Sequence, residues 1–133
     1  MRLYLDASAA VKLVVREEGS DEAREMWQQA DRVLSARTLP LEMRSAVARR
    51  LGGRKLIRAR RQLESILAGA ELVEIDDTLL ERAEEGARAH RLRALDAIHF
   101  AAATEVADPR LVVATWDREL SRAASAAGLT VVP

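Results

Sequence analysis

Short apolar segments alternate with helical segments along this chain of 133 residues. The apolar segments lack the alternating polar face of half-exposed strands, and no hairpin turn joins them. This pattern predicts an α/β fold, a three-layer α/β/α sandwich around a five-stranded, mainly parallel sheet. The expected strands cover residues 2–5, 32–36, 72–75, 111–115 and 130–132. The expected helices cover residues 7–16, 22–30, 40–51, 55–68, 77–90, 95–107 and 117–127.

Chain length and composition predict a single domain over residues 1–133. A chain of this size buries roughly two-thirds of its unfolded surface, and no repeat or composition change divides it. The absence of cysteine excludes disulfides, thiolate metal sites and cysteine nucleophiles. No apolar run approaches the roughly 20 residues of a membrane span. The N-terminal residues reach an acid too early for a secretory signal, so we expect a cytoplasmic protein.

Four acidic residues lie where an expected strand passes into a helix, or in the first turns of a helix. They are Asp6, Glu42, Asp96 and Asp117. In parallel α/β folds such positions meet at one edge of the sheet, where ligands bind near a topological switch point. Each acid alone can equally be a helix cap or a first-turn acid, a role that stabilises a helix by about 1 kcal/mol.

A cluster of carboxylates, with only two histidines in the chain, suits a hard divalent cation such as Mg²⁺ or Mn²⁺. Such an ion activates water for attack on a phosphodiester. Ser8 is expected either to cap the first helix or to hydrogen-bond the Asp6 carboxylate. Thr115 is expected to orient a carboxylate or a metal-bound water. His99, one turn after Asp96, is interpreted as a buried imidazole with a hydrogen-bond partner rather than as a metal ligand.

A basic run from Arg44 to Arg61 contains eight basic residues and no acid. The whole chain balances 21 basic against 21 acidic residues, so its net charge does not indicate a nucleic-acid partner. A local basic patch can still bind phosphate. Alternatively, the arginine side chains cover apolar helix surface while their charges stay in water.

The ordered motifs resemble the PIN-domain ribonucleases, and within them the toxins of VapBC-type toxin–antitoxin modules. The resemblance covers essentially the whole chain. It rests on Asp6-Ala7-Ser8-Ala9 followed by Lys12, on Glu42, on Leu95-Asp96-Ala97-Ile98-His99-Phe100-Ala101, on Thr115-Trp116-Asp117-Arg118-Glu119-Leu120, and on Gly128-Leu129.

The resemblance implies cleavage of RNA that depends on Mg²⁺ or Mn²⁺. It makes Asp6, Asp96 and Asp117 metal ligands and Glu42 a further catalytic residue, with Ser8 and Thr115 in support. It also implies a homodimer and a small cognate antitoxin whose C-terminal segment blocks the site. The basic run then becomes a candidate RNA surface, with Arg44, Arg49 and Arg50 as candidate contacts, although it can equally serve contact between subunits.

Other classes of protein also place acids at the edge of a parallel sheet. A receiver domain would need paired acids after the first strand and an acceptor aspartate after the third, and a haloacid-dehalogenase-type phosphatase would need an aspartate where this chain has Ser8. Both are disfavoured. A PIN-domain nuclease that processes RNA without an antitoxin stays open. So does a non-catalytic interaction module of the same fold, in which the acids act only as helix caps.

Overall fold

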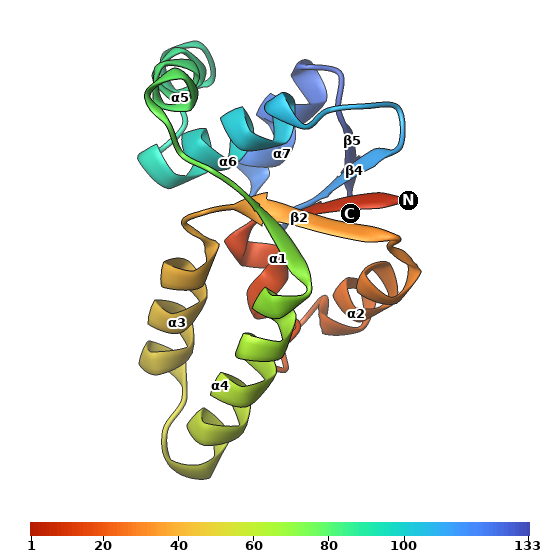
Figure 1. The fold of residues 1–133 in the computed structure, drawn as a ribbon, viewed down its shortest axis with the longest axis vertical. Helices are drawn as coiled ribbons and strands as arrows, with labels where there is room; N and C mark the ends of the chain where they lie inside the picture. The colour runs from red at the N-terminus through yellow and green to blue at the C-terminus, as the bar shows by residue number, and fades with distance from the viewer.

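Five parallel strands form the centre of the molecule (Figure 1). The computed structural model describes residues 1–133. The strands are β1 (Arg2–Leu5), β2 (Arg32–Ala36), β3 (Ala70–Val73), β4 (Leu111–Ala114) and β5 (Thr130–Val132). Their order across the sheet is β3-β2-β1-β4-β5, and every neighbouring pair is parallel. The predicted α/β class is confirmed, with a sheet that is wholly rather than mainly parallel.

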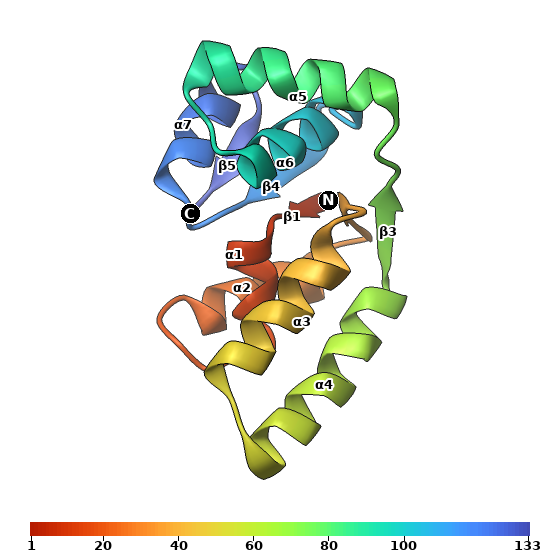
Figure 2. The ribbon, with the colours of Figure 1, turned by 90° about the vertical axis from the view of Figure 1, so that its left-hand side faces the viewer.

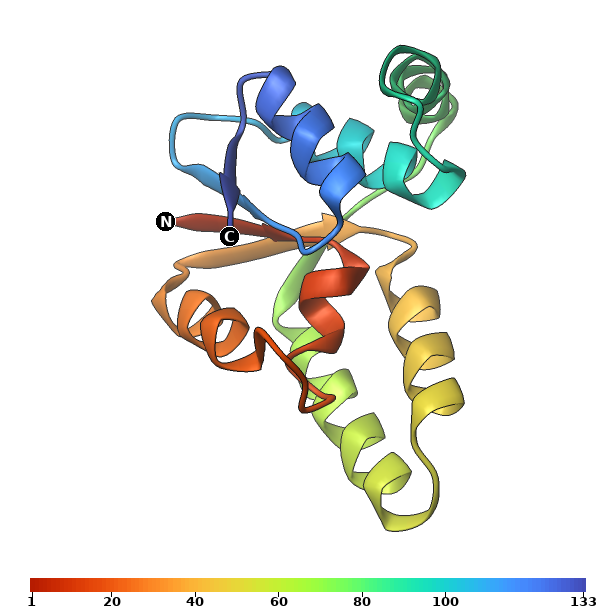
Figure 3. The ribbon, with the colours of Figure 1, turned by 180° about the vertical axis from the view of Figure 1, so that it is seen from behind.

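Helices cover both faces of the sheet. They are α1 (Ala7–Val11), α2 (Ser20–Gln29), α3 (Leu39–Arg50), α4 (Gly53–Ala68), α5 (Asp77–His90), α6 (Ala94–Glu105) and α7 (Arg118–Ala126). Helices α5, α6 and α7 lie on one face and α1 to α4 on the other (Figures 1 and 3). Helices α3 and α4 form a pair that extends away from the sheet (Figure 2). No helix combines the length and apolar character needed to cross a membrane.

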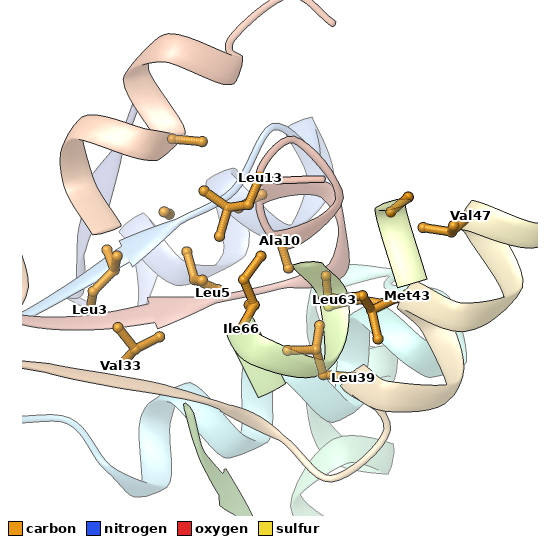
Figure 4. Packing of buried hydrophobic residues seen from close by; sticks show 14 residues of the cluster. Leu3, Leu5, Ala10, Leu13, Val33, Leu39, Met43, Val47, Leu63 and Ile66 are labelled. Carbon is orange, nitrogen blue, oxygen red and sulfur yellow. The ribbon is translucent and has the colours of Figure 1, made fainter. Parts of the chain in front are cut away.

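Two apolar cores lie on opposite faces of the sheet, because successive strand side chains point to opposite sides. Leu3 and Leu5 of β1 pack with residues of α1, α3 and α4, including Met43 and Leu63 (Figure 4). Tyr4, between them, belongs to the second core, under α5, α6 and α7. Burial on both faces explains why the strands carry no polar stripe.

The first helix is shorter than predicted. It was expected to reach residue 16 but ends at Val11, after which the amides of Lys12, Leu13 and Val14 bond to carbonyls three residues back. The chain then turns, and Lys12 Nζ donates across the turn to the Glu18 carbonyl at 2.8 Å. The apolar run continues as a tight turn packed on the core rather than as a helix.

The third strand begins two residues earlier than predicted, at Ala70 instead of residue 72. Helix α4 ends at Ala68 with Gly69 as its C-cap, so the chain enters the strand at once and pairs Ala70 with Val33 of β2. Asp76 then caps α5, which begins at Asp77 as predicted, by accepting from the Leu79 amide.

The chain order places a topological switch point beside β1. The chain builds β1, β2 and β3 toward one edge of the sheet and then returns to place β4 on the other side of β1. The carboxyl ends of β1 and β4 are therefore adjacent, with Leu5 paired to Ala114. In open α/β sheets this position is where ligands bind.

Candidate active site

Asp6 is the most buried acid at the switch point, with 3% of its surface exposed. It follows β1 and caps α1, since its Oδ1 accepts from the Ala9 amide at 2.9 Å. Ser8 Oγ donates to the same carboxylate at 2.7 Å, and Thr115 Oγ1 donates to Oδ2 at 2.6 Å. Burial raises the pKa of Asp6, although these hydrogen bonds partly offset the effect. The residue is both a helix cap and part of a polar centre.

Asp117 follows β4 and mirrors Asp6 at the neighbouring strand end. It caps α7, with Oδ1 accepting from the Leu120 amide at 2.8 Å. Its own amide donates to Thr115 Oγ1 at 3.0 Å, and the Trp116 amide donates to Ser8 Oγ at 2.9 Å. Ser8 and Thr115 therefore join the loops that follow β1 and β4.

Asp96 lies in the first turn of α6, half-buried, and no protein group donates a hydrogen bond to it. Burial, and then the negative charges of Asp117, Asp6 and Glu42, raise the pKa of Asp96 to about 6. Asp96 therefore lies close enough to the other three acids for their charges to disfavour its ionised form. No arginine or lysine forms an ion pair with Asp6, Asp96 or Asp117.

The small residues of α6 explain how Asp96 comes so close to the sheet. Ala97 and Ala101 are buried, as the apolar opening of this helix predicts. On its other side α6 packs closely against α5, where a Cβ added to Gly86 would stand 2.7 Å from the ring of Phe100. Helix α6 is thus fixed between the sheet and α5.

Glu42 is held by a buried chain of hydrogen bonds. It lies in the first turn of α3, and its Oε2 accepts from Thr38 Oγ1 at 3.1 Å and lies 2.7 Å from His99 Nε2. The other ring nitrogen of His99, Nδ1, lies 2.9 Å from the hydroxyl of Tyr4 on β1. The sequence indicated that His99 would be a satisfied buried imidazole, which the structure confirms, but its partners Tyr4 and Glu42 were missed.

The protonation states of His99 and Tyr4 follow from their surroundings. Burial alone would lower the pKa of His99, but the hydrogen bond and charge of Glu42, with the charges of Asp6 and Asp96, raise it above the ordinary value. Burial and the charges of Asp6 and Glu42 raise the pKa of Tyr4 well above its ordinary value. The Tyr4 hydroxyl therefore keeps its proton at neutral pH.

A cleft of about 710 Å³ opens beside these residues, between α1 and α3. Ser8 and Glu42 line it, whereas Asp96 and Asp117 do not. Leu41 and Leu95 at its margin are 71% and 47% exposed. The cleft is also lined by Ala7, Val11, Lys12, Glu17, Ser45, Ala46, Arg49 and Arg50. An elongated ligand can therefore enter beside the acids along the length of α3.

The three candidate RNA contacts have different surroundings. Arg44 is paired with Glu64 of α4 at 2.8 Å, and Arg50 with Glu17 at 2.7 Å. Arg49 lines the cleft and has no ion pair. Arg49 is therefore the one of the three whose charge faces the cleft without a protein counterion.

The donor atoms at the switch point are all carboxylate and hydroxyl oxygens, which suit a hard cation. No group of three or more histidine, aspartate or glutamate side chains in this structure is arranged so that it could hold a metal ion. The oxygens of Asp96 and Oδ2 of Asp117 nevertheless have no hydrogen-bond donor from the protein. The chemistry of the donors fits a divalent cation, and these oxygens are not occupied by hydrogen bonds from the protein.

A sequence model of the PIN domain matches residues 3–126, so the chain belongs to the PIN domain family. Within that family it is a relative of the VapC proteins. Ribonuclease VapC49 of Mycobacterium tuberculosis is 43% identical over 136 residues, covering 98% of this chain and 94% of the relative. Ribonuclease VapC46 of the same species is 34% identical over 131 residues, covering 98% and 95%.

Solved structures share the fold at lower identity. VapC20 of Mycobacterium tuberculosis, a toxin that cleaves the sarcin-ricin loop, superposes with a TM-score of 0.74 at 20% identity and 96% coverage of both chains. A member of the VapBC toxin–antitoxin family from the same species, VapBC-5, gives 0.65 at 21% identity, covering 98% of this chain and 97% of that one. At these identities the likeness is one of fold.

Proposed function

We propose that this chain is a metal-dependent endoribonuclease that hydrolyses RNA phosphodiesters and acts as the toxin of a toxin–antitoxin pair. The observation that carries the proposal is that four carboxylates lie near the switch point and that no arginine or lysine forms an ion pair with Asp6, Asp96 or Asp117. Such mutual repulsion is ordinarily offset by a bound cation. The kinship with VapC ribonucleases supports RNA as the substrate.

Asp6, Asp96 and Asp117 would hold the Mg²⁺ or Mn²⁺ ion. When bound, such an ion lowers the pKa of a coordinated water and offsets charge on the phosphodiester. Ser8 and Thr115 hold the Asp6 carboxylate by their hydroxyls. Glu42 lines the cleft, where its carboxylate can accept a hydrogen bond from a water that approaches the substrate.

The basic residues that follow Glu42 would carry the RNA backbone. Arg49 lines the cleft, and beyond it α4 exposes five basic residues without ion pairs: Arg54, Lys55, Arg58, Arg60 and Arg61. Contacts of this kind position a nucleic acid without reading its sequence. Arg44 and Arg50 would have to leave their glutamate partners to take part.

The toxin role brings a cognate antitoxin and a homodimer into the proposal. The support is the kinship with VapC proteins and the fold shared with a member of the VapBC toxin–antitoxin family. A PIN-domain nuclease that processes RNA without an antitoxin would use the same centre. Light scattering of the purified protein distinguishes a dimer from a monomer.

A non-catalytic interaction module is the second candidate, because Asp6 and Asp117 both perform complete helix caps. In that case their charges serve only α1 and α7. Asp76 caps α5 with the same kind of hydrogen bond, and it follows the edge strand β3, two strands from β1. It therefore offers a matched control for the role of a cap alone.

The test compares cleavage of cellular RNA by Asp96→Asn, Asp6→Asn and Asp76→Asn in buffer that contains Mg²⁺ or Mn²⁺. We expect the first two variants to lose about 100- to 1,000-fold in rate, the range for losing one group that stabilises transition-state charge. Asp76→Asn should keep the wild-type rate. Undiminished cleavage by folded Asp96→Asn would remove the basis of the mechanism, and mapping of 5′ ends identifies the RNA.

A further inference from the structure

We infer that Tyr4 and His99 are positioning residues that hold the Glu42 carboxylate in place for the reaction from inside the core. The inference rests on the proposed nuclease function and deepens it. Each of the three residues comes from a different layer of the fold: Tyr4 from β1, His99 from α6 and Glu42 from α3. Their hydrogen bonds therefore link the sheet to one helix on each of its faces, α3 and α6.

Burial holds the three hydrogen-bonded side chains rigidly in place. Tyr4 has no exposed surface and His99 has 1%, while the Glu42 side chain has 11%. Only the carboxylate end of the chain reaches the cleft. Water cannot reach the polar atoms of Tyr4 and His99, so these atoms depend on hydrogen-bond partners within the protein.

The direction of each hydrogen bond follows from the donor inventory. The Tyr4 hydroxyl keeps its proton and can donate to His99 Nδ1, which leaves the ring proton of neutral His99 on Nε2, facing Glu42. The opposite tautomer would set the lone pair of Nε2 against the carboxylate lone pairs at 2.7 Å, which is repulsive. In an imidazolium both nitrogens donate. In either form Nε2–H donates to Glu42 Oε2.

Glu42 needs this support because its own helix supplies little. Thr38 provides a single hydrogen bond from the preceding turn at 3.1 Å, to the same oxygen. The other carboxylate oxygen, Oε1, has no donor and is free for water or substrate. His99 therefore fixes one oxygen and leaves the other one available in a set direction.

The test is a double-mutant cycle between His99 and Glu42, read as the rate of RNA cleavage. His99→Leu roughly keeps the buried volume but removes both ring nitrogens. We expect kcat to fall about 10- to 100-fold, the range for loss of an outer group that orients a side chain at a metal site, with KM little changed. In a Glu42→Ala background the same change should have less than roughly a twofold effect, because no carboxylate remains to be positioned. Losses that multiply would overturn the inference.

Two further variants keep the test decisive if His99→Leu does not fold. His99→Gln retains an amide N–H that can donate to Glu42 and should recover much of the lost kcat. Tyr4→Phe removes only the hydroxyl and should give a smaller loss than His99→Leu. His90→Gln changes the other histidine, which packs on Phe100 and has no bond to the site, and should keep the wild-type rate.

A second readout needs no catalysis. In ¹⁵N-histidine-labelled, metal-free protein, the Nε2 proton of His99 should be visible and slow to exchange, and Glu42→Ala should make it exchange faster. An Nε2 that carries no proton in the wild type would overturn the inference. If the wild type shows this proton but cleaves no RNA, the proposed function fails and the hydrogen-bond chain stands.

Discussion

Single residues at this site carry a structural and a chemical role at once. Asp6 caps a helix, receives two hydroxyl donors and adds to the charge that raises the pKa of Asp96. From the sequence, either role alone was a sufficient explanation for each acid. The sequence could not show how the acids affect the pKa of Asp96. That pKa is raised by burial and by the charges of three acids from distant parts of the sequence.

The pKa of Asp96 makes a prediction for stability. Because it is raised to about 6 from an unfolded value near 3.8, the folded protein binds the extra proton between those values, so stability rises as the pH falls through 6. The raised pKa values of Asp6 and His99 act in the same direction. The Tm of the metal-free protein should therefore be higher at pH 5.5 than at pH 7.5 by roughly 3 °C or more.

This Tm measurement is compared with the Tm of the Asp96→Asn variant and with the Tm after Mg²⁺ is added. At pH 7.5 the substitution should raise the Tm of the metal-free protein, because it relieves repulsion, and Glu84→Gln on the exposed side of α5 should not. Mg²⁺ should raise the wild-type Tm at pH 7.5 more than that of Asp96→Asn. A wild-type Tm that falls steadily from pH 7.5 to 5.5 would contradict the repulsion between the acids.

The elements were predicted well where a local pattern decides them and poorly where tertiary contacts do. Strand β1 and the caps at Asp6 and Asp117 follow from the residues alone. The end of α1 and the start of β3 do not: Lys12 bonds across a turn to Glu18, and β3 takes its register from β2. The apolar pattern after Val11 does not show where α1 ends, since a helix and a tight turn bury the same side chains. The start of β3 depends on its pairing with β2, which the local sequence does not show.

Helix α4 provides a prediction for RNA binding. Arg58→Ala with Arg61→Ala removes two exposed cations without ion pairs and should weaken binding of RNA to the inactive Asp96→Asn protein. The slope of log affinity against log salt should fall by about 1.4, near 0.7 for each lost contact with single-stranded RNA. Electrophoretic mobility shift over a salt series measures it.

The matched control for α4 is Arg82→Ala with Arg88→Ala on α5, across the sheet (Figure 1). It changes the net charge by the same amount. Equal losses for the two pairs would mean that overall charge, rather than the surface of α4, attracts RNA. An unchanged slope for the α4 pair would assign that surface to another partner, such as an acidic protein segment.

At the scale of the whole molecule, fold and family could be predicted from the sequence because the motifs occur in order along nearly the full chain. The cleft and the hydrogen-bonded Tyr4–His99–Glu42 chain could not, since the cleft depends on how α1 and α3 pack and the hydrogen bonds depend on how α3 and α6 approach β1. The pattern of residues in one sequence does not identify the partner protein or the RNA substrate. The kinship with VapC ribonucleases therefore leads to an experiment in cells.

Induced expression of the wild type should arrest growth, and co-expression of a short adjacent reading frame should relieve the arrest by supplying the antitoxin. Asp96→Asn, expressed at the same level, should not arrest growth. Viable counts after induction measure both effects. Arrest that the neighbouring frame does not relieve would favour a nuclease that works without a partner, and no arrest at all would favour a housekeeping role or a toxin without a target in that host.

The order of the strands has a consequence for biosynthesis. The centre takes its acids from residues 6, 42, 96 and 117, and β4, which brings the last of them beside the first, is inserted next to β1 only after more than a hundred residues have been made. A ribosome-bound fragment that lacks β4 has neither Thr115 nor Asp117. The site with its four acids therefore stays incomplete until β4 and the residues after it have been made.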